Sequence, residues 1–334
     1  MTSSDSLTVA LFGAAHSHAD YLLRELDSLS ALILVAVGDS DPERVREVAL
    51  QRQVPLYTSL DELLAEHSPD LVFLAGVYSE RAAAAVTALN HGAHVLADKP
   101  LCLSLAEADQ IEAAARASGK TASLLLEKRF YPETQAAWEA VRSGQIGQLV
   151  SIAATAPHRL DPAARPAWFT DPASYGGLIG DLPIHDIDLA LWFSEAGEGT
   201  VSALTGRSVA APDGFDDYGT VLLRAGQVIA SLEASWLVPG GAASAGEYRM
   251  FFTGTEGTLD LNWGTGRAVL TTQTEGPREL ELGARQGPAR TTLESFIAGR
   301  EPLIGTAESL LATRVALSGQ SSAQHEGLPF PWRA

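Results

Sequence analysis

Residues 9–23 read "VALFGAAHSHADYLL", an apolar stretch followed by a glycine turn and the start of a helix pattern. A strand, a glycine-containing turn and a helix open the βαβ unit of dinucleotide-binding folds, in which three glycines shape the turn. Here the three places fall on Gly13, Ala15 and His18. Only the first is a glycine, so this stretch by itself fits a dinucleotide turn and an ordinary strand-to-helix connection about equally well.

The two histidines of this turn have three interpretations. Ser17 and Asp20 predict a capping box that starts a helix at Ser17, with His16 just outside it. A helix N-terminus attracts anions, and an imidazole N–H of His16 or His18 could add a hydrogen bond to a diphosphate. The other interpretations are a plain loop and a metal site. The nearby sequence offers no third ligand at a zinc-like spacing, so we expect no metal.

The segments after this turn alternate between apolar strand patterns and helix patterns. Near-continuous apolar runs are typical of parallel strands buried on both faces. The pattern predicts a Rossmann-type doubly wound parallel sheet over residues 1–126. Its further strand patterns lie at 31–39, 70–76, 94–100 and 121–130, and its helix patterns at 41–53, 59–67, 81–92 and 101–119.

The rhythm changes at residue 127. Alternating segments separated by short turns occupy roughly residues 201–272, which is typical of antiparallel strands. We therefore predict a second, α+β domain at 127–334 with an open, largely antiparallel sheet. Helix patterns precede and follow that sheet, at 132–144, 181–193, 291–299 and 306–323.

Composition narrows the class of protein. The chain has 334 residues, 46% of them hydrophobic, and a formal charge of −18, which disfavours nucleic acid as a partner. No run of about 18 apolar residues predicts a membrane span, and the N-terminus lacks a basic start and a cleavage pattern. We therefore expect no membrane association and a cytoplasmic location. The single cysteine, Cys102, excludes an internal disulfide and is interpreted as a small buried hydrophobe.

Asp39 stands where the second strand pattern ends. In a dinucleotide fold an acid at this place bonds a ribose hydroxyl. Asp41 and Pro42 already provide the start of the next helix, which leaves Asp39 available. Carboxylates here would repel a 2′-phosphate, so NAD is favoured over NADP as the cofactor.

Two further places carry residues suited to chemistry. Lys99 ends a strand pattern and precedes Pro100, which biases it toward the extended conformation at the sheet edge where ligands bind. In the 181–193 pattern, Asp181, His185 and Asp188 fall on one helix face. A solvated lysine and an ordinary polar helix face are the alternatives, and the spacing alone leaves them open.

Four motifs, taken in order, resemble those of the Gfo/Idh/MocA family of NAD(P)-dependent oxidoreductases. They are "AHVLADKPLCLSLAEADQI" at 93–111, "EKRFYPETQAAWEAVRSGQIGQLV" at 127–150, "YGGLIGDLPIHDIDLALWF" at 175–193 and "GTEGTLDL" at 254–261. The resemblance spans essentially the whole chain. It implies hydride transfer between NAD(P) and a secondary hydroxyl or ketone of a sugar, inositol or related polyol. It also implies a homodimer or homotetramer formed through the second-domain sheet.

The resemblance also assigns roles by position. Lys99, Asp181 and His185 match the residues that the family uses around the reacting carbon, so we expect them to be catalytic. His158 and Trp168, in the loop expected to border the substrate pocket, and Arg129, after the last Rossmann strand, are the candidate substrate contacts. The expected cofactor contacts are Phe12, Gly13, Ala14, Ala15, His16, Asp39, Ala75, Asp98 and Lys99.

The sequence departs from the family pattern on the cofactor side. The turn reads "GAAHSH", Asp98 replaces a glutamate before Lys99, and Gly76, Val77 and Arg81 occupy a loop that differs from the family's nicotinamide-side loop. Two alternative functions therefore remain open. One is a non-catalytic regulator of the same fold that senses cofactor or sugar, and the other is a metal-dependent lyase or isomerase using His16 and His18.

Overall fold

The computed structural model describes residues 6–161, 165–209, 211–242 and 246–334. The chain divides into two compact units. The first contains the residues up to Leu126 together with 173–176 and 286–313, and the second contains 127–172, 177–285 and 314–334. Each unit is described by itself below.

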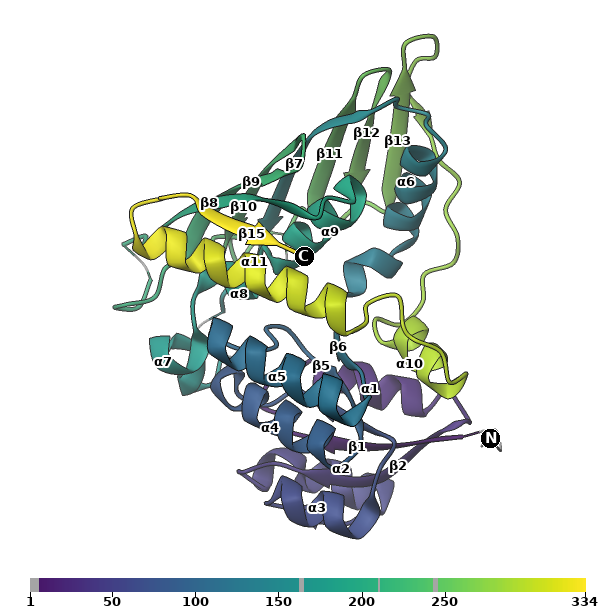
Figure 1. Cartoon of the computed structure of the whole chain (residues 1–334), viewed down its shortest axis with the longest axis vertical. Helices are drawn as coiled ribbons and strands as arrows, with labels where there is room; N and C mark the ends of the chain where they lie inside the picture. The colour runs from purple at the N-terminus through teal and green to yellow at the C-terminus, as the bar shows by residue number, and fades with distance from the viewer. Residues whose placement is uncertain (1–5, 162–164, 210, 243–245) are drawn as a thin grey trace. The chain divides into compact units, whose positions relative to one another are not determined.

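The first unit is built on a six-stranded sheet in the order β3-β2-β1-β4-β5-β6, with every pair parallel. The central strands are buried because helices lie against both faces, as their apolar runs predict. This confirms the Rossmann sheet (Figure 1). The strands are β1 (Leu7–Phe12), β2 (Leu32–Gly38), β3 (Leu56–Tyr57), β4 (Leu71–Leu74), β5 (His94–Ala97) and β6 (Ala122–Leu124).

Capping residues fix the ends of two helices of this unit, α3 and α5. Ser59 and Ser104 each accept a hydrogen bond from a backbone amide of the first turn, and Gly119 ends its helix in the left-handed conformation. The helices are α1 (Ala19–Leu26), α2 (Glu43–Arg52), α3 (Leu60–His67), α4 (Tyr78–Asn90), α5 (Leu105–Ser118) and α10 (Arg290–Ile297).

The predicted capping box at Ser17 is wrong. Helix α1 begins at Ala19, and its N-cap, His18, makes no side-chain capping bond. The carbonyls of His16 and Ser17 accept from the amides of Ala19 and Asp20, so a tight turn precedes the helix. That turn satisfies the amide that a serine cap would have bonded.

The second unit contains a nine-stranded sheet in the order β14-β13-β12-β11-β7-β10-β9-β8-β15. All neighbours are antiparallel except β7 and β10, which are parallel. The predicted largely antiparallel sheet is confirmed. The strands are β7 (Leu149–Pro157), β8 (Glu198–Gly206), β9 (Tyr218–Ala225), β10 (Val228–Ser235), β11 (Arg249–Gly254), β12 (Gly257–Asn262), β13 (Arg267–Thr272), β14 (Arg278–Glu279) and β15 (Phe330–Arg333).

Helices cover one face of this sheet. Helix α6 (Pro132–Arg142) packs on β12 and β13, and α9 (Ile184–Ser194) packs on β7, β9 and β10. Residues alternate strictly between buried and exposed along β9 and β10, so their other face is open. The remaining elements are η1 (Glu127–Phe130), η2 (Ala167–Thr170), α7 (Pro172–Tyr175), α8 (Leu178–Asp181) and α11 (Thr306–Gln324).

Two predicted elements have different bounds. The strand pattern at 121–130 ends at Leu124 and gives way to the short helix η1. The helix pattern at 181–193 begins too early: Asp181 ends the short helix α8, and α9 begins only at Ile184, because Pro183 has no N–H to continue the hydrogen-bond ladder. Among the described residues, no helix is both long and apolar enough to cross a membrane.

Candidate functional site

Gly13 follows β1 and brings two loops of the parallel sheet into close approach. Its φ is +82°, and a Cβ placed on it would lie 2.5 Å from the Cα of Gly76 after β4. Its amide also donates to the carbonyl of Gly38, at the end of β2. Gly13 is therefore required both by its conformation and by contact, at the point where the strand order reverses and where dinucleotides bind in open α/β sheets. At Gly76 a Cβ would lie 3.5 Å from the Cα of Gly13, an ordinary contact, so the close approach depends on Gly13.

Asp39 lies directly after β2 and is almost completely buried. Its Oδ2 accepts from the amide of Ala14 at 2.7 Å, and its Oδ1 accepts from the amide of Asp41 at 2.9 Å and from Arg44 Nη1 at 3.1 Å. Asp39 is therefore bonded within its own loop and to the turn after β1. The sequence suggested a carboxylate left free, and that expectation is wrong. A small pocket opens beside it; its lining is Phe12, Gly13, Asp39, Ser40, Leu74, Gly76, Glu80, Arg81 and Ala84.

The turn that follows Gly13 turns its histidines inward. His16 is 6% exposed, and its amide donates to the carbonyl of the fully buried Ala75. His18 is half-buried and stacks on Tyr21, while Ala14 and Ala15 are half-buried. Because the amides of Ala14 and His16 are already bonded within the protein, this turn differs from one whose amides bind a diphosphate.

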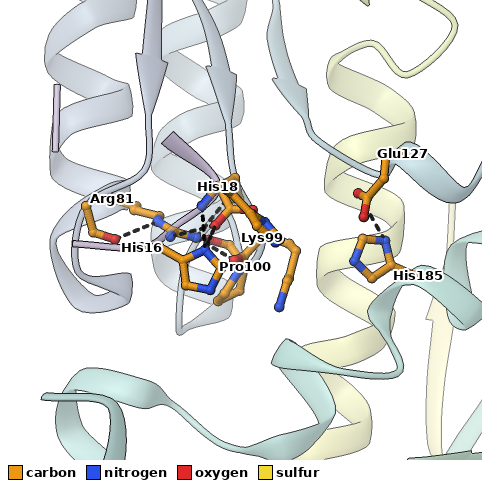
Figure 2. A network of polar contacts seen from close by, with 9 residues as sticks. His16, His18, Arg81, Lys99, Pro100, Glu127 and His185 are labelled. Carbon is orange, nitrogen blue, oxygen red and sulfur yellow. Dashed lines mark hydrogen bonds and ion pairs between the residues drawn. The ribbon is translucent and has the colours of Figure 1, made fainter. Parts of the chain in front are cut away.

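Both histidines converge on Asp98, which lies directly after β5 and is fully buried. Asp98 Oδ2 lies 3.0 Å from His16 Nδ1 and 3.0 Å from Arg81 Nη2, and Asp98 Oδ1 lies 2.7 Å from His18 Nδ1. Figure 2 shows the labelled members drawn together. We call His16, His18, Arg81 and Asp98 the Asp98 cluster.

The cluster shifts the protonation of its members. Burial by itself raises the pKa of Asp98, but its interactions with His18, Arg81 and His16 outweigh burial and hold the pKa well below the ordinary value. For His16, burial dominates over the attraction of Asp98 and lowers the pKa to about 4. The structure therefore holds a carboxylate beside a neutral His16 imidazole at neutral pH.

Arg81 links the cluster to Lys99. It is 1% exposed, and its guanidinium donates to the carbonyls of Gly76, Asp98, Lys99 and Pro100 as well as to Asp98 Oδ2. Lys99 is itself 6% exposed, at the carboxyl end of β5 where ligands bind in open sheets. Sequence reasoning noted Arg81 only as a departure. The available signal was its place in the first turn of a helix, a few residues after Gly76.

In the second unit, Asp181 ends α8 and His185 lies in the first turn of α9. Asp181 is fully buried and His185 is 6% exposed. His185 Nδ1 lies 3.8 Å from Oε2 of the buried Glu127, and Figure 2 shows the two side chains pointing toward one another. Pro183 separates the two helices, so Asp181 does not lie on one helix face with His185. The predicted shared face is wrong for this pair.

The acids next to His185 are each paired with a cation. Arg129 donates to both oxygens of Asp188, at 2.7 and 2.6 Å, and Lys128 Nζ donates to Asp186 at 2.8 Å. All four side chains are buried. Asp188 is thus a structural partner of Arg129, and the guanidinium of Arg129 is held by that pair rather than presented singly; its contact with substrate stays a prediction.

The two other predicted substrate contacts lie among aromatic side chains of the second unit. The ring of His158 packs against Trp236 at 5.3 Å and Tyr248 at 4.8 Å between centroids. Burial raises the pKa of Tyr248. Trp168, in η2, is half-buried and packs against Phe169. Both therefore contribute to packing, whatever they contact in a ligand.

These features define a class of protein. A parallel sheet in this strand order, with a glycine turn after β1 and a buried acid after β2, is a Rossmann-type dinucleotide-binding domain. Residues 7–125 match the family model described as an oxidoreductase family with an NAD-binding Rossmann fold, and residues 134–260 match the GFO/IDH/MocA C-terminal domain. The chain belongs to the GFO/IDH/MocA oxidoreductase family, which confirms the resemblance seen in its motifs.

Curated relatives and solved structures agree with this assignment. The chain is 31% identical to inositol 2-dehydrogenase of Streptomyces avermitilis over 69% of this chain and 66% of that protein. It is 28% identical to trans-1,2-dihydrobenzene-1,2-diol dehydrogenase of Bos taurus over 57% of this chain, and the match spans only 56% of the bovine protein. A putative oxidoreductase from Thermotoga maritima has the same fold, with a TM-score of 0.88, 21% identity, and coverage of 98% of this chain and 100% of that one.

Proposed function

We propose that the protein is an NAD-dependent dehydrogenase or reductase that acts on a secondary hydroxyl, or the matching ketone, of a sugar, inositol or related polyol. The observation that carries the proposal is Lys99, buried at the carboxyl end of β5 within the family's Lys-Pro motif. A lysine is not held in such a position for solubility. Membership of the oxidoreductase family and the names of the inositol and diol dehydrogenase relatives support the substrate class.

The first unit offers a place for the adenosine ribose of a dinucleotide. The Gly13–Gly76 approach, which a Cβ would block, and the pocket beside Asp39 suit an adenosine ribose. The pocket lining contains two carboxylates, Asp39 and Glu80. Their charge disfavours a 2′-phosphate, which supports NAD over NADP. Arg44, next to Asp39, is the residue that would have to turn away from it to accept NADP.

The proposed roles follow from the chemistry of each side chain. NAD, when bound, accepts the hydride from the carbinol carbon. His185 takes the hydroxyl proton as general base, Asp181 orients the base or a neighbouring substrate hydroxyl, and Lys99 stabilises the charge that develops on oxygen. The proximity of Glu127 to His185 Nδ1 supports a base whose orientation is fixed by an acid.

We further propose that the protein assembles as a homodimer or homotetramer through the open face of the nine-stranded sheet. That face exposes apolar side chains that a second copy would cover. They are Leu204, Leu222, Ile229 and Phe251. Light scattering on eluting protein, with Leu222→Glu as the disrupting variant, measures this. From the sequence alone we also propose that the protein acts in the cytoplasm.

The function is tested by calorimetric titration with NAD and NADP, followed by a screen of polyols and sugars for the absorbance of reduced cofactor. NAD binding with turnover of at least one polyol or sugar is expected. Binding of neither nucleotide contradicts the proposal, and NAD binding without any turnover supports a sensor instead.

Lys99→Met tests the assigned chemistry. Turnover should fall by about 10²- to 10⁴-fold with NAD affinity retained, as for loss of a group acting on the reacting oxygen. Lys120→Met, which changes a half-buried lysine with no assigned role in the mechanism, is the matched control. Unchanged turnover in Lys99→Met removes Lys99 from the mechanism.

A further inference from the structure

The Asp98 cluster contains three groups of the kinds that bind transition metals. Each of His16, His18 and Asp98 offers a ligand atom, and these atoms all lie within 4.8 Å of one another. It is the one such group found among the described residues. Two of its members come from the turn after β1, and the third comes from the end of β5.

Distances within the group suit a common ion. Atoms that bind zinc tetrahedrally at about 2.0–2.2 Å lie roughly 3.3–3.6 Å from each other. The contacts of Asp98 with His16 Nδ1 and His18 Nδ1 are 3.0 and 2.7 Å. Since all three ligand atoms lie within 4.8 Å of one another, small side-chain rotations bring them to the separations of a common zinc site.

Without an ion, hydrogen bonds alone do not satisfy all of these atoms. Two ring nitrogens face the two oxygens of a single carboxylate, so each Nδ1 must carry a proton to donate. Yet His16 Nδ1 also lies 3.3 Å from the amide of His18, which can only donate to it. A neutral Nδ1 cannot donate and accept at once, whereas one divalent ion would satisfy both rings and the carboxylate.

We propose that His16, His18 and Asp98 bind a divalent transition-metal ion, for which Zn²⁺ is the natural probe. Two imidazoles and a carboxylate are a known zinc ligand set, and they leave a coordination position open. The charge of Asp98 is shared with Arg81, and Lys99 is a second cation close by. The bound ion therefore keeps excess positive charge, which favours an anion or hydroxide at the open position.

This site goes beyond the proposed function, because hydride transfer with Lys99 and His185 does not need the ion. Its position does suggest a consequence. The ligands lie at the edge of the sheet where a dinucleotide diphosphate is held in open α/β folds. An ion there would offer a diphosphate the positive charge that the amides of Ala14 and His16, already bonded within the protein, do not.

The experiment measures metal binding directly. The full chain, purified without a polyhistidine tag and freed of metal with a chelator, is titrated with Zn²⁺ by calorimetry and with Co²⁺ by visible absorption. We expect one ion per chain and the visible bands of Co²⁺ bound by nitrogen and oxygen. His16→Ala and His18→Ala should each weaken binding at least tenfold, and His91→Ala and His325→Ala, which change exposed histidines, should not.

Two results would overturn the metal proposal. No stoichiometric binding by the unaltered protein overturns the proposal, and so does equal binding by the His16 and His91 variants. If an alanine variant unfolds, His16→Gln and His18→Gln replace it, and the rise in melting temperature on adding Zn²⁺ is compared with that of the unaltered chain. NAD binding and turnover are measured on the metal-free protein. Failure of the metal site and failure of the dehydrogenase assignment therefore give different results.

Discussion

Buried charges are arranged differently in the two units. Next to α9, each acid has a cation of its own: Arg129 holds Asp188 with two hydrogen bonds, and Lys128 holds Asp186. In the Asp98 cluster, one carboxylate is shared by a guanidinium and two imidazoles.

The difference separates structural charges from charges suited to ligands. A one-to-one buried pair uses up both partners, so it fixes the position of a helix and has little left for chemistry. A carboxylate shared by several nitrogen groups can redistribute protons, or can bind an ion in place of some of these hydrogen bonds. Glu127 and His185, 3.8 Å apart, are in this respect closer to the shared arrangement than to the neighbouring pairs.

Arg129→Met breaks a one-to-one pair and should have the largest effect. It leaves the Asp188 carboxylate buried without its cation, which costs about 3–5 kcal/mol of unfolding free energy. Equilibrium unfolding in urea measures the loss. Arg116→Met is the matched control, because its ion pair with Glu112 is exposed on a helix surface and should contribute little. A loss no larger than that of Arg116→Met would show that the Arg129 pair is not structural.

Gly13→Ala tests how closely the turn beneath the Asp98 cluster is held. The new Cβ would lie 2.5 Å from Gly76 at a φ of +82°, so both strain and collision oppose it. We expect a loss of about 3 kcal/mol of unfolding free energy, and weaker NAD binding. Gly92→Ala separates the two causes, because Gly92 has φ +83° but nothing within 4 Å of a Cβ. Equal losses in the two variants would mean that the Gly76 contact adds nothing.

Much of the fold could be predicted from the sequence because its signals are local. The parallel strands are uninterrupted apolar runs, and the serine caps of α3 and α5 lie beside the amides that they bond. Prediction failed where one residue outweighed the pattern around it. Helix α9 begins only after Pro183, although the apolar spacing begins before it, and the tight turn at His16 removes the need for a cap at Ser17.

The candidate site was only partly predictable for a different reason. Lys99 and His185 stand in motifs that can be read along the chain, whereas the partner of the histidine pair lies 80 residues from His18. No spacing rule links residues brought together by neighbouring strand ends. The third metal ligand, absent from the sequence near His16, is supplied by the topology of the sheet. The same holds for Arg81, whose acceptors follow a different strand.

Glu127→Gln tests whether the looser pair in the second unit serves catalysis. If Glu127 orients His185, the amide should lower kcat by about ten- to hundredfold while KM and the unfolding free energy change little. The pH profile of kcat should also shift, because a neutral partner no longer stabilises the protonated imidazole. Glu127→Asp, which restores the charge, should recover part of the activity. A change confined to stability would place Glu127 with the structural pairs.

His94, a histidine outside the Asp98 cluster, tests the comparison through a gradual dependence of stability on pH. Burial lowers its pKa to about 4, and its Nδ1 accepts from the amide of Thr121. The unfolded chain protonates this group near pH 6.5, so unfolding takes up a proton between about pH 6.5 and 4, and stability falls as the pH falls through that window. The slope contributed by one such group is at most about 1.4 kcal/mol per pH unit. His94→Asn keeps an acceptor for Thr121 and cannot titrate, so its unfolding free energy should depend less steeply on pH between 4 and 6.5 and run parallel to that of the unaltered chain above pH 7. If the unfolding free energies of the two chains ran parallel over the whole pH range, the pKa of His94 would not be lowered in the folded protein. Burial outside the Asp98 cluster would then leave the pKa of a histidine unchanged.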